Sequence, residues 1–207
     1  MNFSNEMDTI RQIVTEVMKC MQENAASEYD GASEYRVQCN RWLCSTVEEA
    51  ITNAKESQKI LRAASIEKRN CIIDAMRQEA RKNAEYLARI AHEETKYGNV
   101  ADKTAKNLLA ANKTPGTEDL HPVAFSGDNG LTIVEGAPYG VIGSITPSTN
   151  PTSTIINNSI SMIAAGNAVV YNPHPAAKRA SQEAMRILNE SIVTAGGPPC
   201  LITTVKE

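Results

Sequence analysis

The sequence lacks several features that would place it in a familiar class of protein. Its five cysteines form no CxxC pair and have no histidine near them in the sequence, so we expect buried, reduced thiols and no metal site. The net charge of −3 gives no reason to expect nucleic acid as a partner. No uninterrupted apolar run is long enough to span a membrane, and residues 1–21 lack the apolar centre of a signal peptide. We therefore expect a cytoplasmic protein with no membrane association.

Proline and charge are each missing from one part of the chain. All nine prolines lie at or after Pro115, and only Glu135 is charged between residues 129 and 177. The architecture is therefore expected to change near residue 115. The earlier part is rich in Lys, Arg and Glu, which is typical of solvated outer helices. The uncharged stretch indicates a segment that is buried or lines a ligand.

Residues 1–21 have the pattern of an amphipathic helix, and residues 22–36 have that of a flexible acidic linker. The apolar stripe of the helix consists of Ile10, Ile13, Val14, Val17, Met18 and Met21. Because an isolated helix of this length is only marginally stable in water, the stripe needs a partner surface. The pattern leaves two alternatives open, namely a detachable docking helix or a helix that packs on its own domain.

A series of amphipathic helices is expected over residues 45–113. Thr46 and Glu49 have the spacing of a capping box at the start of the first helix. A second helix begins at Ser65, the pattern continues over residues 83–92, and another helix covers residues 101–111.

After residue 115 the hydrophobic pattern becomes that of a wound α/β fold. Residues 131–135 and 141–146 are β-type runs separated by the turn-like sequence GAPYG. The segments that follow alternate between helix and strand: helix 151–165, strand 168–171, helix 176–195 and strand 201–205. This β-α-β-α-β order predicts a parallel, doubly wound sheet.

Ligands of parallel sheets bind beyond the carboxyl ends of the strands. Three loops are expected to converge at that edge, namely residues 147–150, residues 172–175 and the region after Val205. The first two are polar and could contact a neutral or anionic ligand at a helix N-terminus. Asn150 also has the position of a helix N-cap before Pro151. Neither GxGxxG nor a P-loop motif is present.

Residues 140–154 (GVIGSITPSTNPTST) and 165–175 (AGNAVVYNPHP) closely resemble the aldehyde dehydrogenase superfamily, and specifically its CoA-acylating branch. The resemblance extends from about Val37 to the end of the chain. It implies an α/β fold in which N-terminal helices precede the first half of a Rossmann-like parallel sheet, so that residues 37–207 form a partial cofactor-binding domain. Because the resemblance implies only half of the sheet, we expect the edge at residues 201–205 to be unpaired and to promote self-association. Residues 122–138 resemble a strand segment through which the family oligomerises, which implies a homo-oligomer at full length.

The resemblance also implies a reaction, the NAD-dependent conversion of a short-chain aldehyde to acyl-CoA. A cysteine thiolate attacks the aldehyde, the thiohemiacetal passes a hydride to NAD, and coenzyme A takes the acyl group from the resulting thioester. None of the five cysteines matches the family's nucleophile, which we expect beyond Glu207. The chain as given is therefore expected to be inactive alone.

Individual site roles follow from the same resemblance. Asn150 is the candidate oxyanion donor, and Thr149 is the alternative because it holds the place, two residues before proline, of the family's asparagine. The candidate cofactor-binding residues are Thr146, Pro147, Ser148, Asn172, Pro173, His174, Pro175, Gly196 and Pro198.

The N-terminal helix with its linker resembles the peptides that bring such enzymes into bacterial microcompartments. This resemblance implies that residues 1–21 bind a shell or core protein and that the protein lies in the microcompartment lumen. The alternative function is that of a truncated homologue without catalysis, which would act as a docking or assembly partner in a microcompartment.

Overall fold

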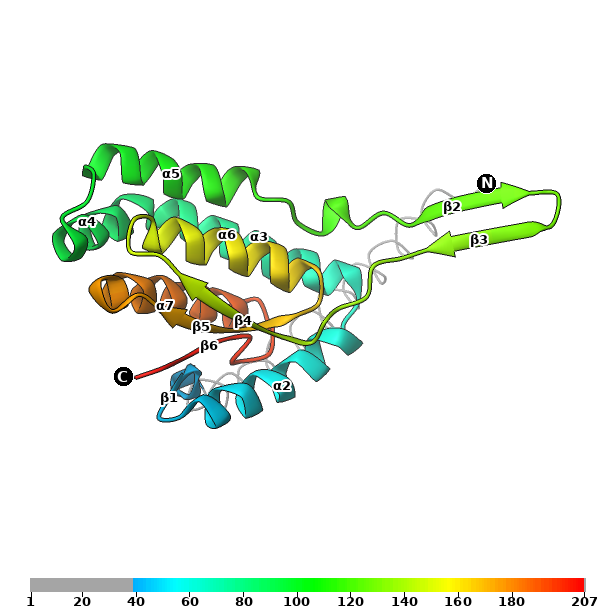
Figure 1. The fold of residues 1–207 in the computed structure, drawn as a ribbon, viewed down its shortest axis with the longest axis horizontal. Helices are drawn as coiled ribbons and strands as arrows, with labels where there is room; N and C mark the ends of the chain where they lie inside the picture. The colour runs from blue at the N-terminus through cyan, green and yellow to red at the C-terminus, as the bar shows by residue number, and fades with distance from the viewer. Residues whose placement is uncertain (1–38, 207) are drawn as a thin grey trace, which may run out of the picture. The chain divides into compact units, whose positions relative to one another are not determined.

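The computed structural model describes residues 39–206, shown in Figure 1. The helix predicted at residues 1–21 and the linker predicted at residues 22–36 lie outside the described part. Within residues 39–206, no helix combines the length and apolarity needed to cross a membrane, and no cluster of three or more His, Cys, Asp and Glu side chains has the geometry of a metal site.

Helices dominate the chain before residue 115. They are α2 (Val47–Ala63), α3 (Ile66–Lys82), α4 (Ala84–Thr95) and α5 (Val100–Lys113). The side chains of Thr46 and Ser65 accept hydrogen bonds from the backbone N–H groups of Glu49 and Lys68, which fixes the starts of α2 and α3. Both predicted helix starts are confirmed.

The main sheet contains three parallel strands that alternate with helices, as predicted. The elements are β4 (Val141–Thr146), α6 (Pro151–Ala164), β5 (Ala168–Pro173), α7 (Lys178–Thr194) and β6 (Ile202–Val205). A short 3-10 helix (Pro175–Ala177) precedes α7. In Figure 1, α6 and α7 lie on one face of the sheet and α2 lies on the other. Helices α6 and α7 end at Gly166 and Gly196, whose positive φ angles of 82° and 70° reverse the chain toward the next strand.

The edges of this sheet differ from the prediction. A two-residue strand, β1 (Leu43–Cys44), follows the 3-10 helix Cys39–Trp42 and pairs in parallel with Thr204 and Val205 of β6. The backbone N–H of Lys206 extends the pairing by donating to the Cys44 carbonyl at 2.9 Å. The prediction of an unpaired edge at residues 201–205 is therefore wrong. The edge strands of this sheet within residues 39–206 are β1 and β4, and the Ile145 side chain of β4 is 85% exposed.

A separate antiparallel hairpin precedes the main sheet. Strands β2 (Val123–Gly127) and β3 (Gly130–Val134) pair only with each other, and all ten of their residues are exposed. The hairpin projects from the helices and the sheet in Figure 1. Residues 135–139 form an extended connection rather than a hairpin turn, because β3 pairs with β2 and not with β4. The turn predicted there is therefore wrong, although both strand segments exist.

The hydrophobic core lies between the sheet and the helices on its two faces, with α2 packed against β5 and β6 and with α3 packed against α6 and α7. Its largest fully buried side chains are Leu61, Ile72, Met76, Leu87, Ile155, Ile156, Ile160, Ile163, Tyr171, Met185, Leu188 and Ile192. Tyr171 is the polar exception, and its hydroxyl is satisfied by Ser159 Oγ at 2.9 Å. Cys44 and Cys200 are buried as expected, whereas Cys71 is exposed on α3 and contradicts that expectation.

Three basic side chains of α3 bind the carbonyl ends of three other helices. Lys68 Nζ donates to the carbonyl of Ala195 after α7 at 3.0 Å, and Arg69 Nη1 donates to that of Ala164 in α6 at 3.1 Å. The Arg77 guanidinium donates to the carbonyls of Ala111 and Thr114 at the end of α5, at 2.9 and 2.7 Å. The sequence predicts a solvated face for these cations, and Lys68 is exposed as predicted, whereas Arg69 and Arg77 are half-buried. All three satisfy and electrostatically complement helix C-termini.

We predict that Arg77→Met lowers the free energy of unfolding by about 2 kcal/mol, because two charge-assisted hydrogen bonds are lost and a buried carbonyl is left without its donor. Denaturant unfolding followed by circular dichroism measures the change. Arg62→Met is the matched control, since Arg62 is exposed on α2 and makes no hydrogen bond with the described residues. Equal stability of the two variants would contradict this role of Arg77.

Candidate functional site

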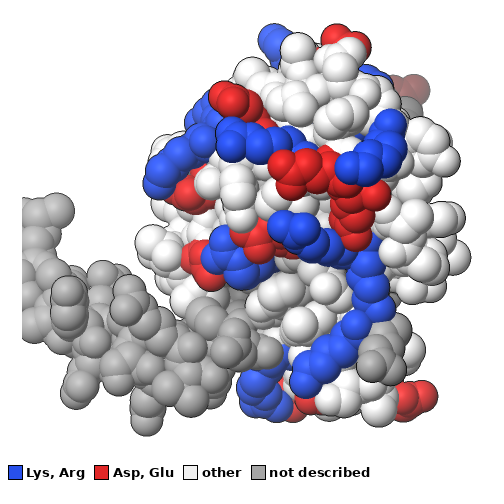
Figure 2. Space-filling view, turned by 90° about the vertical axis from the view of Figure 1, so that its left-hand side faces the viewer, with Lys and Arg blue, Asp and Glu red and all other residues white. Residues whose placement is uncertain are grey.

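The carboxyl ends of β4 and β5 bring most of the predicted site residues together. Thr146 is paired with Pro173 in the sheet register, and the backbone N–H of His174 donates to the Thr146 carbonyl at 3.1 Å. The loop that begins at Pro147 therefore starts beside the Asn172–Pro175 segment. Figure 2 views the side of the protein at which these strands end, and basic and acidic side chains are interspersed over it. A ligand there meets local donors rather than a surface of one charge.

Two exposed polar side chains, His174 and Asn172, lie at this edge, and the buried Thr146 lies beside them. His174 is exposed, and its Nδ1 accepts a hydrogen bond from the backbone N–H of Ala176 at 3.1 Å. The neutral ring therefore carries its hydrogen on Nε2 and keeps that donor for a second partner. Thr146 is almost completely buried, and its Oγ1 has no hydrogen-bond partner among residues 39–206. Asn172 is exposed on β5.

The structure places Gly196 and Pro198 elsewhere. Both lie between the end of α7 and the start of β6, which is the amino edge of the parallel sheet and therefore the opposite edge from Thr146 and His174. A side chain at Gly196 would meet Lys68 Nζ of α3, and Pro198 is buried. These two residues match the family pattern in sequence, but the topology separates them from the other candidates, so we leave them out of the site.

The N-terminus of α7 does not offer the anion site that its position suggests. The Glu94 carboxylate, from α4, accepts hydrogen bonds from the backbone N–H groups of Arg179 and Ala180 at 2.9 and 2.7 Å. An internal anion thus already occupies the place where the sequence predicted contact with an anionic ligand. The N-terminus of α6 differs, because its N-cap Asn150 makes no side-chain capping bond.

Asn150 is the N-cap of α6 by position, as predicted, but its side chain is engaged by α5. Lys106 Nζ donates to Asn150 Oδ1 at 3.1 Å. Because an ammonium group can only donate, this bond identifies the oxygen end of the amide and leaves the Nδ2 group as a donor. Nδ2 makes one long contact of 3.5 Å with Thr149 Oγ1. Its donor capacity suits a developing negative charge.

A buried lysine, which the sequence did not single out, holds the same loop. Lys103 is 6% exposed, and its Nζ donates to the backbone carbonyl of Thr149 at 2.9 Å. Burial lowers the pKa of Lys103, and the nearby Lys106 charge lowers it further. The sequence does contain one indication of this burial. Lys103 lies at i, i+4, i+8 spacing with Asn107 and Ala111, so the three residues share one face of α5, and that face is buried.

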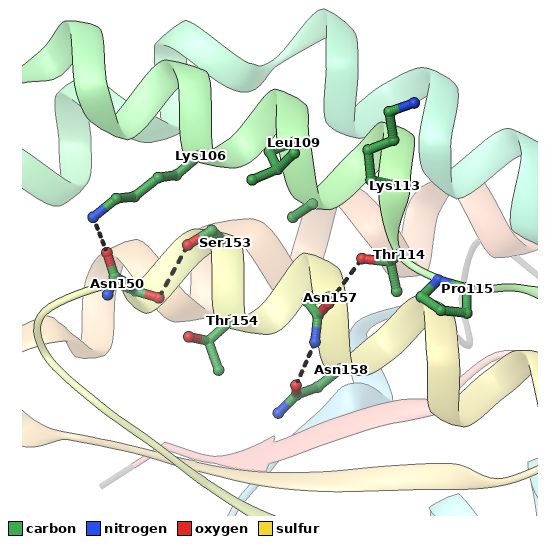
Figure 3. A pocket seen from close by; sticks show the side chains of 11 residues that line it. Lys106, Leu109, Lys113, Thr114, Pro115, Asn150, Ser153, Thr154, Asn157 and Asn158 are labelled. Atoms are coloured by element: carbon green, nitrogen blue, oxygen red, sulfur yellow. Dashed lines mark hydrogen bonds between the residues drawn. The ribbon is translucent and has the colours of Figure 1, made fainter.

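A groove of about 540 Å³ lies between α5 and α6, next to Asn150 (Figure 3). Its lining contains no acidic side chain and consists of Lys106, Leu109, Ala110, Lys113, Thr114, Pro115, Asn150, Ser153, Thr154, Asn157 and Asn158. Thr114 Oγ1 donates to Asn157 Oδ1 at 2.8 Å, and Asn157 Nδ2 donates to Asn158 Oδ1 at 3.1 Å. These bonds fix amide and hydroxyl groups along the wall of the groove.

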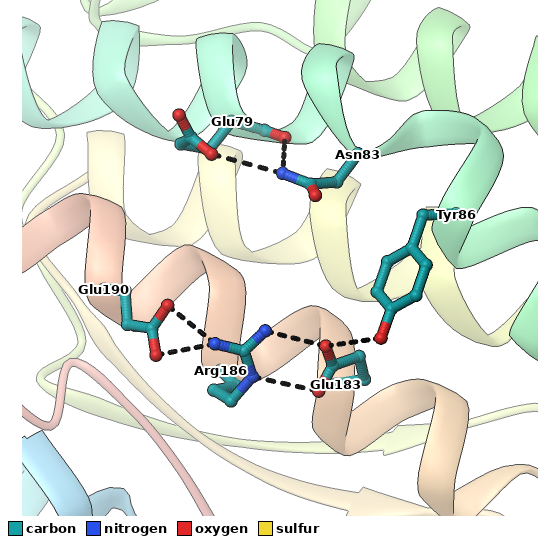
Figure 4. A network of polar contacts seen from close by, with 6 residues as sticks. All are labelled: Glu79, Asn83, Tyr86, Glu183, Arg186 and Glu190. Atoms are coloured by element: carbon teal, nitrogen blue, oxygen red, sulfur yellow. Dashed lines mark hydrogen bonds and ion pairs between the residues drawn. The ribbon is translucent and has the colours of Figure 1, made fainter.

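A second hollow, lined in part by Lys178 and Arg179, lies between α4 and α7, and its carboxylate Glu183 is paired with Arg186. Arg186 bridges Glu183 and Glu190 at 2.7 Å, and the Tyr86 hydroxyl donates to Glu183 (Figure 4). The hydrogen bond from Arg186 is the main reason that the pKa of Glu183 is lowered. We therefore assign this network to helix packing rather than to ligand binding.

Comparison with known proteins identifies the family. The model of the aldehyde dehydrogenase family matches residues 22–207. The chain belongs to this family. It is 48% identical over 203 residues to an acetylating acetaldehyde dehydrogenase of Bilophila wadsworthia, and the alignment covers 96% of this chain and 41% of that protein. Its relatives are CoA-acylating aldehyde dehydrogenases, and the chain spans about two fifths of the length of those it matches.

Solved structures of family members support the same assignment. A propionaldehyde dehydrogenase from the fucose utilisation microcompartment of Clostridium phytofermentans aligns with a TM-score of 0.78 and 49% identity, over 80% of this chain and 38% of that one. A Rhodopseudomonas palustris propionaldehyde dehydrogenase with bound CoA and an acylated cysteine aligns with a TM-score of 0.78 and 44% identity, over 81% of this chain and 38% of that one. The predicted α/β fold with part of an aldehyde dehydrogenase sheet is confirmed.

We predict that Glu183→Gln destabilises this aldehyde dehydrogenase family chain by about 1 kcal/mol at neutral pH, because the Arg186 ion pair is lost. The pKa of Glu183 is lower in the folded protein than its ordinary value of 4.5, so its stabilising contribution is present above that pH and is lost as the pH falls through the folded pKa. The difference in unfolding free energy between wild type and variant should therefore shrink below about pH 4.5.

Urea unfolding at a series of pH values measures this difference. Glu56→Gln is the control, because Glu56 is exposed on α2 and pairs with no cation in the described part of the chain. A wild-type to Glu183→Gln difference that stays constant down to pH 3 would contradict the role of the carboxylate.

Proposed function

We propose that this chain is the N-terminal part of an NAD-dependent, CoA-acylating aldehyde dehydrogenase that converts a short-chain aldehyde to acyl-CoA. The single observation that carries the proposal is the Asn150 amide, whose oxygen is held by Lys106 at 3.1 Å so that its nitrogen can donate. It stands at the uncapped N-terminus of α6 and beside the groove between α5 and α6. This arrangement suits the stabilisation of a thiohemiacetal oxyanion.

Asn150 is the better donor of the two alternatives. Thr149 has its backbone carbonyl bound by Lys103, and its Oγ1 is the acceptor of the long contact from Asn150 Nδ2. Asn150 presents an amide whose orientation is fixed from the oxygen side. In the proposed reaction Asn150 therefore donates to the oxyanion, while Thr149 supports the loop.

The carboxyl edge of the sheet has donors that fit a nucleotide. His174 offers Nε2–H, Asn172 offers an exposed amide, and the buried Thr146 Oγ1 is without a partner among the described residues. Pro147, Ser148, Pro173 and Pro175 shape the same edge. NAD would supply the hydride acceptor and coenzyme A would supply the thiol that takes the acyl group. The attacking cysteine belongs to the part of the family that this chain does not match.

A chimera tests the proposal directly. Residues 1–207 would replace the matched N-terminal part of the Bilophila wadsworthia enzyme, which supplies the remaining length. We predict that the chimera forms NADH from acetaldehyde only when CoA is present, whereas the isolated chain forms none. Asn150→Ala should lower kcat by about a hundredfold or more, because one oxyanion donor is removed. Absorbance at the NADH band measures both results.

The control for this experiment is Asn189→Ala at the far end of α7, where the amide donates to the carbonyl of Ile202 in the core. That variant measures the cost of losing a buried amide that lies outside the site. A folded chimera without CoA-dependent activity would contradict the proposal and favour the alternative, a docking or assembly partner without catalysis. NADH formation by the isolated chain would also contradict the assignment of the nucleophile.

We further propose that residues 1–21 dock onto a microcompartment shell or core protein and direct the protein to the microcompartment lumen. The apolar stripe from Ile10 to Met21 supports this proposal, as does the microcompartment origin of the Clostridium phytofermentans relative. The exposed β2–β3 hairpin supports a homo-oligomer at full length.

We predict that residues 1–22 fused to a fluorescent protein concentrate in microcompartments when the shell proteins are coexpressed. Fluorescence microscopy measures the distribution. Replacing Ile13 and Val17 by Asp should disperse the signal, because the apolar face is interrupted, whereas replacing Arg11 and Thr15 on the polar face by Ala should preserve it. Diffuse fluorescence of the unmodified fusion would contradict the docking role.

A further inference from the structure

We propose that Lys103 is a positioning residue that sets the orientation of the Thr149–Asn150 peptide, so that the backbone N–H of Asn150 becomes a second donor beside the Asn150 side chain. The catalytic part of this inference rests on the proposed function, whereas the orientation of the peptide follows from hydrogen bonds within this chain. Lys103 Nζ binds the Thr149 carbonyl at 2.9 Å.

Peptide geometry determines where the attached N–H points. The carbonyl of Thr149 and the N–H of Asn150 belong to one peptide unit, and no peptide bond in the described residues is cis. In a trans peptide the C=O and N–H bonds point in opposite directions. Because Lys103 draws the carbonyl toward α5, the N–H of Asn150 points away from α5. No acceptor within residues 39–206 bonds to this N–H.

Two lysines one turn apart on α5 therefore control two donors of one residue. Lys106 binds Oδ1 of the Asn150 side chain, and Lys103 fixes the peptide that carries the Asn150 backbone N–H. Both lysines bind oxygen atoms, so neither engages the nitrogen donors of Asn150, and Nδ2 makes only the long contact of 3.5 Å with Thr149 Oγ1. Two nitrogen donors of one residue, at a helix end with no side-chain cap, suit negative charge on oxygen.

The burial of Lys103 argues that the interaction serves the loop rather than overall stability. Its side chain is 6% exposed, and no carboxylate in the described part of the chain pairs with it. A buried charge without a counter-charge is unfavourable, and an apolar side chain of similar size often stabilises such a position. If Lys103 served only to fill space between the helices, its ammonium group would add nothing to that packing.

Lys103→Met separates these two roles. We expect the isolated 207-residue chain to keep or raise its melting temperature, while the ¹³C′ resonance of Thr149 and the amide resonance of Asn150 shift because the carbonyl loses its donor. Lys103→Arg keeps a charged donor and should return both resonances toward the wild-type positions. Lys106→Met is the control, because it removes the side-chain bond of Asn150 and should leave the Thr149 ¹³C′ resonance in place.

An unchanged Thr149 ¹³C′ resonance in Lys103→Met would overturn the proposal. Equal shifts in Lys103→Met and Lys103→Arg would also overturn it, because they would assign the effect to packing. In the active chimera, Lys103→Met should lower kcat by about tenfold or more with a smaller change in KM for the aldehyde, and Lys103→Arg should restore part of the loss. Lys59→Met, an exposed position on α2, is the control for activity.

These outcomes separate the two proposals. A wild-type chimera that is folded but inactive counts against the proposed function, while the resonances of the isolated chain still decide the role of Lys103. An active chimera in which Lys103→Met keeps its full kcat overturns the positioning role and leaves the proposed function intact.

Discussion

The arrangement of the helices depends on donation from basic side chains of α3 to the carbonyl ends of α5, α6 and α7. Helix C-termini leave carbonyl groups without partners, and the partial negative charge there favours a cation. Lys68, Arg69 and Arg77 supply one partner each for the three helices. Because α5 and α6 are held at their ends by the same helix, the opposite ends of these two helices also keep a fixed separation. The bond from Lys103 to the Thr149 carbonyl lies at those opposite ends.

Polar contacts also fix α2 to the other side of the sheet. Gln58 Nε2 donates to the Gly166 carbonyl at 3.0 Å, and Thr203 Oγ1 of β6 donates to the Ala50 carbonyl at 3.2 Å. Both bonds are buried, so a shift of α2 would leave polar groups without partners in an apolar interior. The sheet is therefore bounded by helices whose positions are set by directional bonds as well as by apolar contact.

The parts of the fold that the sequence predicts are those with a repeating pattern. The alternation of apolar residues and the glycines at 166 and 196 define β4 to β6 and the helices between them, and each element appears close to its predicted bounds. Strand β1 was not predictable because two residues have no period. Its pairing with Thr204 and Val205 depends on the position of the finished sheet edge.

The candidate site was predictable in location and less so in detail. Parallel strands place the ends of β4 and β5 side by side, so the convergence of Thr146 and His174 follows from topology alone. The same topology excludes Gly196 and Pro198 from the candidate site, because both lie at the amino edge of the sheet. Their match to the family pattern gave no information on that position. The engagement of Asn150 by Lys106 depends on a contact between residues 44 positions apart in the sequence, and no local pattern encodes it.

Glu94 has a consequence for how charge is distributed along this edge. Helices α6 and α7 both begin there, and each would present a positive end of similar strength. The Glu94 carboxylate cancels that of α7, while Lys103 and Lys106 add to that of α6. The free backbone donors at this edge therefore belong to α6 rather than to α7, although Lys178 and Arg179 keep positive charge at the start of α7.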